Sequence, residues 1–182
     1  MIFNKTKIEG AYLIDLEPIK DDRGFFSRAW SKAEFQKHGL VTDYPEWNLS
    51  YNNKEGTTRG MHFQKNPHAE VKLVRCTRGS LVDIFIDLRK DSPTRYEWAS
   101  IELRPEKYQF LYIPAGCAHG YQTLEDETEI TYSVSSSYAS DSEGSIRWND
   151  PFFSIKWPKN EDVIISEKDG NCPDFDPTNC PF

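Results

Sequence analysis

The sequence lacks long apolar runs and basic clusters, and each absence narrows the range of functions. No segment of the 182 residues approaches the roughly 18 apolar residues of a membrane-spanning helix, and the first residues lack the apolar core of a secretion signal. The net charge of −7, without any run of lysine and arginine, disfavours nucleic acid as a partner, because binding to phosphate backbones needs an extended basic face. We therefore expect a cytoplasmic protein that binds neither nucleic acid nor membrane.

Cysteines are few and far apart. Cys76, Cys117, Cys172 and Cys180 form no Cys-x-x-Cys motif, so they lack a spacing that is typical of zinc sites. We expect free thiols in a reducing compartment. The alternative, a disulfide or a metal clip between Cys172 and Cys180, has less support.

What the sequence does contain is a series of short strand-like segments. Aromatic residues make up 14% of the chain, and apolar runs recur between turns with Gly, Pro or Asp. A helix is predicted over 32–38, because Ser31 and Glu34 form a capping box and Gly39 can end a helix in the left-handed conformation. Strands are predicted over 11–16, 25–30, 48–51, 58–64, 72–76, 80–87, 98–103, 109–113 and 128–135.

This pattern predicts a mainly β fold, an antiparallel double-sheet jelly roll with one short N-terminal helix. The segment 165–182 is expected to form an irregular tail on the surface. A chain of 182 residues suits one domain over 1–182. We expect the N-terminal strands and the helix over 1–56, a core over 57–151 and a C-terminal segment over 152–182.

The densest group of candidate functional residues lies between Arg59 and Arg75. The two arginines, Lys72 and His62 fall on two predicted neighbouring strands of an acidic chain. Strand alternation directs His62 away from its two apolar neighbours in the sequence. Burying a base beside unpaired cations is costly unless an anionic ligand or a carboxylate completes the group. We therefore expect a pocket for a charged small molecule.

Three residues outside this stretch have both a structural and a functional interpretation. His119 ends a Pro-x-Gly-x-x-His segment that is similar to the second motif of the cupins. Tyr132 has the strand parity of apolar neighbours, so on parity alone it is a core tyrosine. Asp169, in Ser-Glu-Lys-Asp-Gly, is a solvated loop acid unless the fold returns the tail to the pocket.

Taken together, six ordered motifs resemble the dTDP-4-dehydrorhamnose 3,5-epimerase family. The resemblance spans nearly the whole chain, from Asp22-Arg-Gly-Phe-Phe to Asp169. It implies a cofactor-free, cupin-type jelly roll that forms a homodimer. The motifs are Arg59-Gly-Met-His-Phe-Gln, Lys72-Leu-Val-Arg, Val82-Asp-Ile-Phe-Ile-Asp-Leu-Arg with Ser92-Pro-Thr, Ile113-Pro-Ala-Gly-Cys-Ala-His-Gly, Trp148-Asn-Asp-Pro and Ser166-Glu-Lys-Asp.

The resemblance also implies a reaction, epimerisation at C3, C5 or both of a nucleotide-linked 4-keto-6-deoxyhexose. A ketone at C4 acidifies the neighbouring C–H bonds, so a base can form an enolate that is reprotonated from the opposite face. By position, His62 is the base, Asp169 orients it, Lys72 stabilises the enolate oxygen and Tyr132 is the acid. Such an isomerase serves deoxysugar biosynthesis of the rhamnose kind for surface polysaccharide, such as lipopolysaccharide O-antigen.

Further family positions predict the residues that bind the substrate. Where glutamate and glutamine are usual in the nucleotide-binding region, this chain has Arg28 and Glu46, and Glu70 replaces a common glutamine. These changes alter charge and hydrogen-bond donors, and they favour the hypothesis that the nucleotide is CDP or GDP instead of dTDP. The predicted substrate-binding residues are Arg23, Phe26, Arg28, Glu46, Asn48, Arg59, His119, Tyr138, Glu143 and Lys168.

The sequence is also compatible with two other functions. A metal-dependent cupin enzyme usually has His-x-His in its first motif, and here only His68 and Glu70 could take the place of the missing ligand. A non-catalytic sugar-binding jelly roll would need no base, lysine and phenol around one sugar. We expect no metal and no cofactor.

Overall fold

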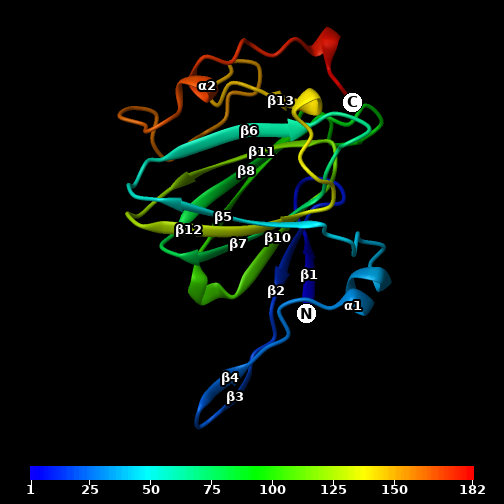
Figure 1. Ribbon diagram of the computed structural model, residues 1–182, viewed down its shortest axis with the longest axis vertical. Helices are drawn as coiled ribbons and strands as arrows, with labels where there is room; N and C mark the ends of the chain where they lie inside the picture. The colour runs from blue at the N-terminus through cyan, green and yellow to red at the C-terminus, as the bar shows by residue number, and fades with distance from the viewer.

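Two antiparallel sheets face each other in the structure, a computed structural model that describes residues 1–182 (Figure 1). Every pair of neighbouring strands is antiparallel, and most neighbours are distant in the sequence, as in a jelly roll. The six-stranded sheet has the order β1 (Ile2–Lys5), β2 (Tyr12–Asp15), β10 (Gln109–Ile113), β7 (Lys72–Arg78), β12 (Thr128–Val134) and β5 (Glu46–Asn52). The five-stranded sheet has the order β13 (Glu143–Ser145), β6 (Thr58–Gln64), β11 (Cys117–Thr123), β8 (Leu81–Asp87) and β9 (Trp98–Leu103).

A separate two-stranded hairpin, β3 (Ile19–Asp21) and β4 (Gly24–Phe26), projects away from both sheets (Figure 1). The predicted helix is confirmed within one residue as α1 (Lys32–Lys37), and the Ser31 side chain accepts a hydrogen bond from the Glu34 amide. The other helical segments are short: η1 (Pro105–Lys107), η2 (Ser140–Ser142), α2 (Glu167–Gly170) and η3 (Pro177–Asn179). None of the helices has the length and apolar character that crossing a membrane requires.

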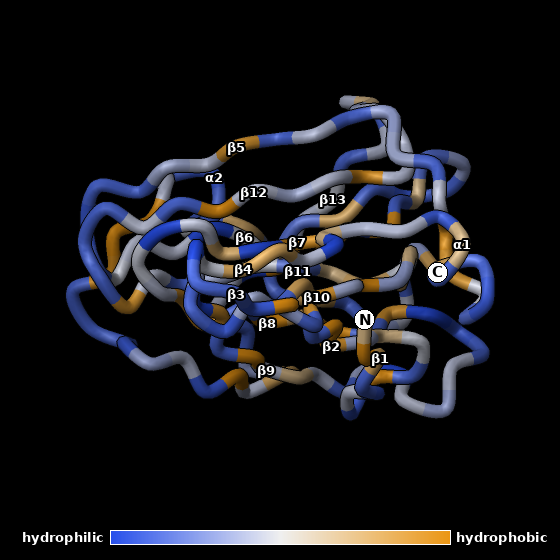
Figure 2. Tube along the Cα trace, turned by 90° about the horizontal axis from the view of Figure 1, so that it is seen from below, coloured by the Kyte–Doolittle hydropathy of each residue, from blue (hydrophilic) through white to orange (hydrophobic).

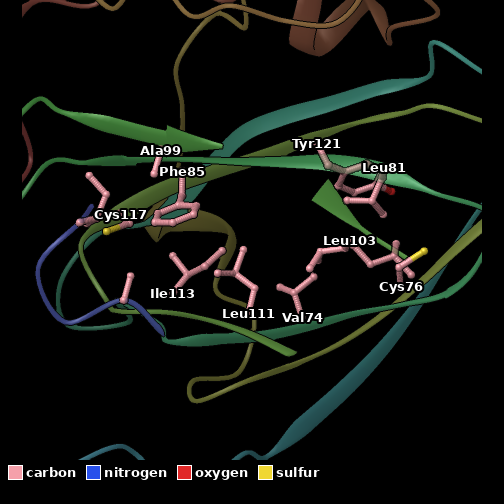
Figure 3. Close-up of a cluster of buried hydrophobic side chains, with 13 residues drawn as sticks. Val74, Cys76, Leu81, Phe85, Ala99, Leu103, Leu111, Ile113, Cys117 and Tyr121 are labelled. Atoms are coloured by element: carbon pink, nitrogen blue, oxygen red, sulfur yellow. The ribbon is translucent and has the colours of Figure 1, made fainter. Parts of the chain in front are cut away.

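The main core lies between the two sheets, where side chains from both inner faces interdigitate (Figure 3). Val74 and Leu111 of the six-stranded sheet meet Phe85 and Leu81 of the five-stranded sheet, and all four are fully buried. This core fills one part of the interlayer space. Around the rest of this space, the inner faces of the two sheets carry the polar side chains described below.

Two further apolar clusters cover the outer faces of the sheets. Met61 and Phe63 of β6 pack beneath Trp148 and Trp157 of the C-terminal segment. On the other side, Phe35 of α1 packs on the outer face of the six-stranded sheet. Hydrophobic residues therefore concentrate along the strands, whereas the connecting loops at the periphery are mainly hydrophilic (Figure 2).

The structure corrects three sequence-based expectations. The strand predicted over 25–30 ends at Phe26, and residues 27–30 form no regular element. Residues 165–182 are not simply an irregular surface tail, because α2 lies within them and both Asp169 and Cys172 are buried. Strand β11 was not predicted, since its Cys-Ala-His-Gly-Tyr-Gln-Thr sequence has no apolar alternation. All seven of its residues are buried because it pairs with β6 on one side and with β8 on the other.

Candidate active site

His62 and Asp169 form a hydrogen-bonded dyad, although 107 positions separate them in the sequence. His62 Nε2 lies 2.7 Å from Asp169 Oδ1, and the Gly60 amide donates to Asp169 Oδ2 at 3.2 Å. The prediction that His62 and Met61 point to opposite faces of β6 is confirmed, since Met61 packs in the apolar cluster on the outer face of the five-stranded sheet. The dyad leaves Nδ1 of His62 without a partner in the chain, and 35% of the His62 side chain is exposed.

The C-terminal segment reaches the dyad through backbone pairing. Thr58 donates its amide to the Ile164 carbonyl at 2.8 Å, and Ile164 donates to the Gly56 carbonyl at 3.1 Å. Ser166 then caps α2 and accepts a hydrogen bond from the Asp169 amide at 3.1 Å. Asp169 is therefore held beside β6 instead of forming the solvated acid that its local sequence favours.

Electrostatics keep this carboxyl ionised. Burial opposes ionisation of Asp169, but the hydrogen bond and charge of His62, with further hydrogen bonds from Gly60 and Ser166, hold its pKa below the usual range. An ionised Asp169 can orient the imidazole and stabilise its protonated form.

Lys72 and Tyr132 enter the same space from the six-stranded sheet. Lys72 begins β7, its side chain is 11% exposed, and its Nζ lies 3.3 Å from Glu70 Oε1. Tyr132 lies on β12, packs against the interlayer core and makes no hydrogen bond through its hydroxyl. Burial, Tyr121 and the charge of Glu70 raise its pKa, so the phenol retains its proton.

His119 forms a second dyad with a residue that sequence reasoning did not select. His119 Nε2 lies 2.9 Å from Oδ2 of Asp83, which is fully buried on β8. Burial raises the pKa of Asp83, against the opposing effects of His119 and Lys72, and its Oδ1 has no hydrogen-bond partner. The signal in the sequence was an acid inside an apolar strand, where an unpaired carboxylate is costly.

Except for the buried Asp83, these side chains line two adjoining cavities. The larger has a volume of about 600 Å³ and the smaller about 290 Å³, and they share His62, Lys72 and Tyr132. Among the other predicted residues, the larger cavity adds Arg59, His119, Lys168 and Asp169. The smaller adds Glu46, Asn48, Tyr138, Glu143 and the previously unplaced Glu70.

The residues at the rim are linked to one another. Arg59 donates through Nε to Asn52 Oδ1 at 2.9 Å. Glu143 accepts from Lys168 Nζ at 2.6 Å and from the Tyr138 hydroxyl at 3.2 Å. The Lys168 hydrogen bond lowers the pKa of Glu143, so this carboxylate remains charged beside the cavity.

Arg75 and three other predicted residues do not reach this site within one chain. The Arg75 guanidinium lies 5.4 Å from the centre of the Phe110 ring, on the outer face of the six-stranded sheet, because its parity is opposite to that of Lys72. Arg23, Phe26 and Arg28 line neither cavity. Arg23 and Phe26 lie on or beside the projecting hairpin (Figure 1), where the Arg23 side chain is 90% exposed and pairs with Asp21.

The metal-ligand alternative loses its proposed ligands. Nδ1 of His68 lies 2.9 Å from the Ser142 hydroxyl oxygen, and Glu70 is paired with Lys72. The chain contains no cluster of three His, Cys, Asp or Glu side chains arranged to hold a metal ion. The four cysteines are free.

Comparisons with known proteins identify the family and agree with the fold. A family model for dTDP-4-dehydrorhamnose 3,5-epimerase matches residues 5–177. A dTDP-4-dehydrorhamnose 3,5-epimerase of Sinorhizobium fredii is 41% identical over 177 residues, which cover 95% of this chain and 89% of the relative. A dTDP-4-dehydrorhamnose 3,5-epimerase from Elizabethkingia anophelis is 35% identical in sequence to this chain, and its crystal structure matches the fold with a TM-score of 0.95. The match covers 100% of this chain and 99% of the Elizabethkingia chain.

A third similar protein is a dTDP-6-deoxy-D-glucose-3,5-epimerase from Legionella pneumophila, whose crystal structure contains dTDP-4-keto-L-rhamnose. It is 31% identical to this chain and has a TM-score of 0.85. The match covers 92% of this chain and 89% of the Legionella chain. Sequence, fold and named relatives thus indicate one family.

Proposed function

The chain belongs to the dTDP-4-dehydrorhamnose 3,5-epimerase family of isomerases, and from this membership we propose that it epimerises a dTDP-linked 4-keto-6-deoxyhexose at C3, C5 or both. The mechanism is proposed because two of the site's side chains come from opposite sheets. His62 comes from β6 of the five-stranded sheet, and Tyr132 comes from β12 of the facing sheet. A sugar between the sheets would have a base on one face and an acid on the other.

In the first step, His62 removes a proton from the carbon next to the C4 ketone. Its imidazole becomes imidazolium, which the ionised Asp169 stabilises through the 2.7 Å hydrogen bond. The electron pair of the C–H bond moves into an enolate. General base catalysis of this kind typically contributes about 10²–10⁴-fold to the rate.

The enolate oxygen then needs a positive charge close to it. Lys72 is the cation of the shared wall of the two cavities, and it is almost completely buried. An ammonium group in a water-poor site stabilises a developing oxyanion more strongly than it would in water, because the local dielectric constant is low. Removing one such group typically costs about 10²–10³-fold in kcat.

In the last step, Tyr132 donates its phenolic proton to the face opposite His62, and the configuration of the carbon is inverted. The raised pKa of Tyr132 supports this role, since the acid must carry its proton at neutral pH. His62 and Tyr132 return to their starting forms by exchanging protons with solvent.

For the nucleotide, we propose dTDP. The relatives described above are all named for dTDP sugars, and this contradicts the CDP or GDP hypothesis drawn from Arg28 and Glu46. Arg59 and Lys168, which line the larger cavity, are the cations proposed to meet the diphosphate. The exposed ring of Tyr138 is available to stack on the base.

We also propose that the protein is a homodimer in which the β3–β4 hairpin completes the site of the partner. Alone, the hairpin holds Arg23 and Phe26 in solvent, where neither can meet a substrate bound near His62. The edge strand β5 further exposes an outward stripe of Trp47, Leu49 and Tyr51. An edge strand with such a stripe is prone to pair with another chain.

A cytoplasmic location remains a prediction, which the free thiols of all four cysteines support. A non-catalytic sugar-binding role is the second candidate for this cavity. It would require no acid and base on opposite sheets, so we give it less weight.

The decisive experiment incubates the protein with dTDP-4-keto-6-deoxy-D-glucose in D₂O and follows C3 and C5 by NMR. Catalysed deuterium incorporation with a change of configuration is the expected result. Counting the labelled carbons distinguishes mono- from double epimerisation. Binding without exchange would instead favour the sugar-binding role.

A further inference from the structure

Glu70 is the one carboxylate of the cavities whose place the sequence did not explain. It lies in the loop between β6 and β7, and its side chain is 11% exposed. Its Oε1 lies 3.3 Å from Lys72 Nζ, and its Oε2 accepts from Gln64 Nε2 at 2.9 Å. Glu70 also lines the smaller cavity together with His62 and Tyr132. A buried acceptor thus stands beside the proposed reacting groups.

The group that holds Glu70 is itself firmly anchored. Gln64 is buried at the end of β6, and its Oε1 accepts from the Ala139 amide at 2.7 Å. Its Nε2 also lies within hydrogen-bond distance of the carbonyl oxygens of His68 and Ser137. Because both sides of the Gln64 amide are bonded to the backbone, the Glu70 carboxylate is held in one place.

We propose, on the basis of the function proposed above, that Glu70 accepts a hydrogen bond from the substrate hydroxyl at C3, next to the C4 ketone. Lys72 and Glu70 present a donor and an acceptor 3.3 Å apart. An α-hydroxy ketone presents the complementary pair, an acceptor on the carbonyl and a donor on the hydroxyl, about one hydrogen-bond length apart. Each carboxylate oxygen can accept more than one hydrogen bond, so Lys72 and Gln64 do not exhaust Glu70.

This pairing makes Glu70 a specificity-determining residue. A substrate without the C3 hydroxyl would leave the carboxylate short of a donor, and sites built to bind a hydroxyl discriminate strongly against analogues that lack it. Glu70 would also hold the ammonium of Lys72 at the oxygen of the ketone. The first effect depends on the hydroxyl of the substrate, whereas the second does not, and this difference permits a test.

The test compares wild type and Glu70→Ala with two substrates, dTDP-4-keto-6-deoxy-D-glucose and its 3-deoxy analogue. The measured quantity is kcat/KM for deuterium incorporation at C5, a carbon that both substrates share. We expect Glu70→Ala to lose about 10- to 100-fold more activity with the hydroxylated substrate than with the 3-deoxy analogue. Any loss of kcat/KM that is the same for both substrates measures the second role of Glu70, which is to hold the Lys72 ammonium at the ketone oxygen.

Two further variants complete the design. Glu70→Gln retains one acceptor oxygen, so it should keep part of the discrimination that Glu70→Ala loses. Glu129→Gln removes a carboxylate on β12 that accepts a hydrogen bond from the Thr77 hydroxyl and lines neither cavity, so it should change neither rate. Equal losses with both substrates in Glu70→Ala would overturn the assignment to the hydroxyl. Lack of exchange with wild type would instead overturn the proposed function.

Discussion

At the level of single residues, the two histidines and Lys72 of the site each have one carboxylate partner, whereas Arg59 donates to the amide oxygen of Asn52. The histidines and the lysine of the cavities would otherwise be partly buried without compensation, and that is costly. The carboxylates also fix the direction of the groups that they bind. The pairs are His62–Asp169, His119–Asp83 and Lys72–Glu70.

The first prediction concerns the charge of Asp169. Asp169→Asn keeps the shape of the side chain but removes the charge that stabilises protonated His62, so kcat should fall by about 10²–10⁴-fold with a smaller change in KM. Rates of epimerisation measured by NMR test this. Asp43→Asn, an exposed position without a side-chain hydrogen bond, serves as the control. Wild-type kcat in Asp169→Asn would contradict the role of the dyad.

The second prediction concerns Tyr132 as the acid. In Tyr132→Phe, His62 can still remove the proton and return a deuteron to the same face, so isotope exchange should persist while inversion falls by about 10²-fold or more. Comparing the two rates on one sample separates the steps. A parallel loss of exchange and inversion would argue that Tyr132 does more than protonate.

The pH profile gives a third prediction for the same phenol. The proposed acid works only when it is protonated, which it is below its pKa. Since burial raises this pKa above the ordinary value of 10.0, the loss of activity caused by Tyr132 should begin only above about pH 10. A stopped assay of kcat/KM at increasing alkaline pH measures the pH at which this loss begins. Circular dichroism checks that the protein remains folded at each pH.

At the level of elements, the site depends on the close approach of β6 and β11. A Cβ atom at Gly60 would lie 2.5 Å from the Cα of Gly120 and 2.7 Å from the His119 carbonyl oxygen, and Gly60 has a φ of +119°. Only glycine fits here without displacing the strands that carry Arg59, His62 and His119.

The fourth prediction follows from this contact. Gly60→Ala should destabilise the fold by about 1–3 kcal/mol or more and lower activity, because both the backbone conformation and the spacing of the strands oppose a Cβ. Thermal and urea unfolding measure the first effect. Gly39→Ala is the matched control, since φ is +69° but no atom lies within 4 Å of the added Cβ. Similar losses in both variants would show that crowding at β11 contributes nothing.

At the level of the whole molecule, one chain contains most of a site but not all of the residues predicted for it. The hairpin projects away from both sheets (Figure 1), and its residues Arg23 and Phe26 line neither cavity of their own chain. A symmetric dimer would supply the same hairpin to both sites. The protein should therefore be a dimer by sedimentation analysis.

The fifth prediction tests whether the hairpin crosses to the partner. Arg23→Ala and His62→Ala should each have low activity alone. When the two variants are mixed and allowed to exchange subunits, each heterodimer contains one site with both residues intact, so activity should recover to about a quarter of that of wild type. Absence of recovery, despite heterodimers detected by native mass spectrometry, would place the hairpin outside the partner's site.

Much of the fold followed from local patterns. Turns and apolar runs predicted β6 and β9 to the residue, and the capping box predicted α1, because these signals act over a few neighbours. Parity also predicted correctly that His62 points away from Met61 and that Tyr132 shares a face with Ile130. Of the 14 site residues that the family resemblance predicted, 11 line the two cavities.

The sequence by itself therefore determined the family, most of the strands and the identity of the proposed reacting groups. Only the tertiary structure decided that backbone pairing of the C-terminal segment holds Asp169 beside β6, that His119 pairs with Asp83, and that Glu70 lies between Lys72 and Gln64. The reason is that such contacts depend on strand pairing, loop closure and packing between distant segments. Residues that are adjacent in the sequence give no local signal for contacts of this kind.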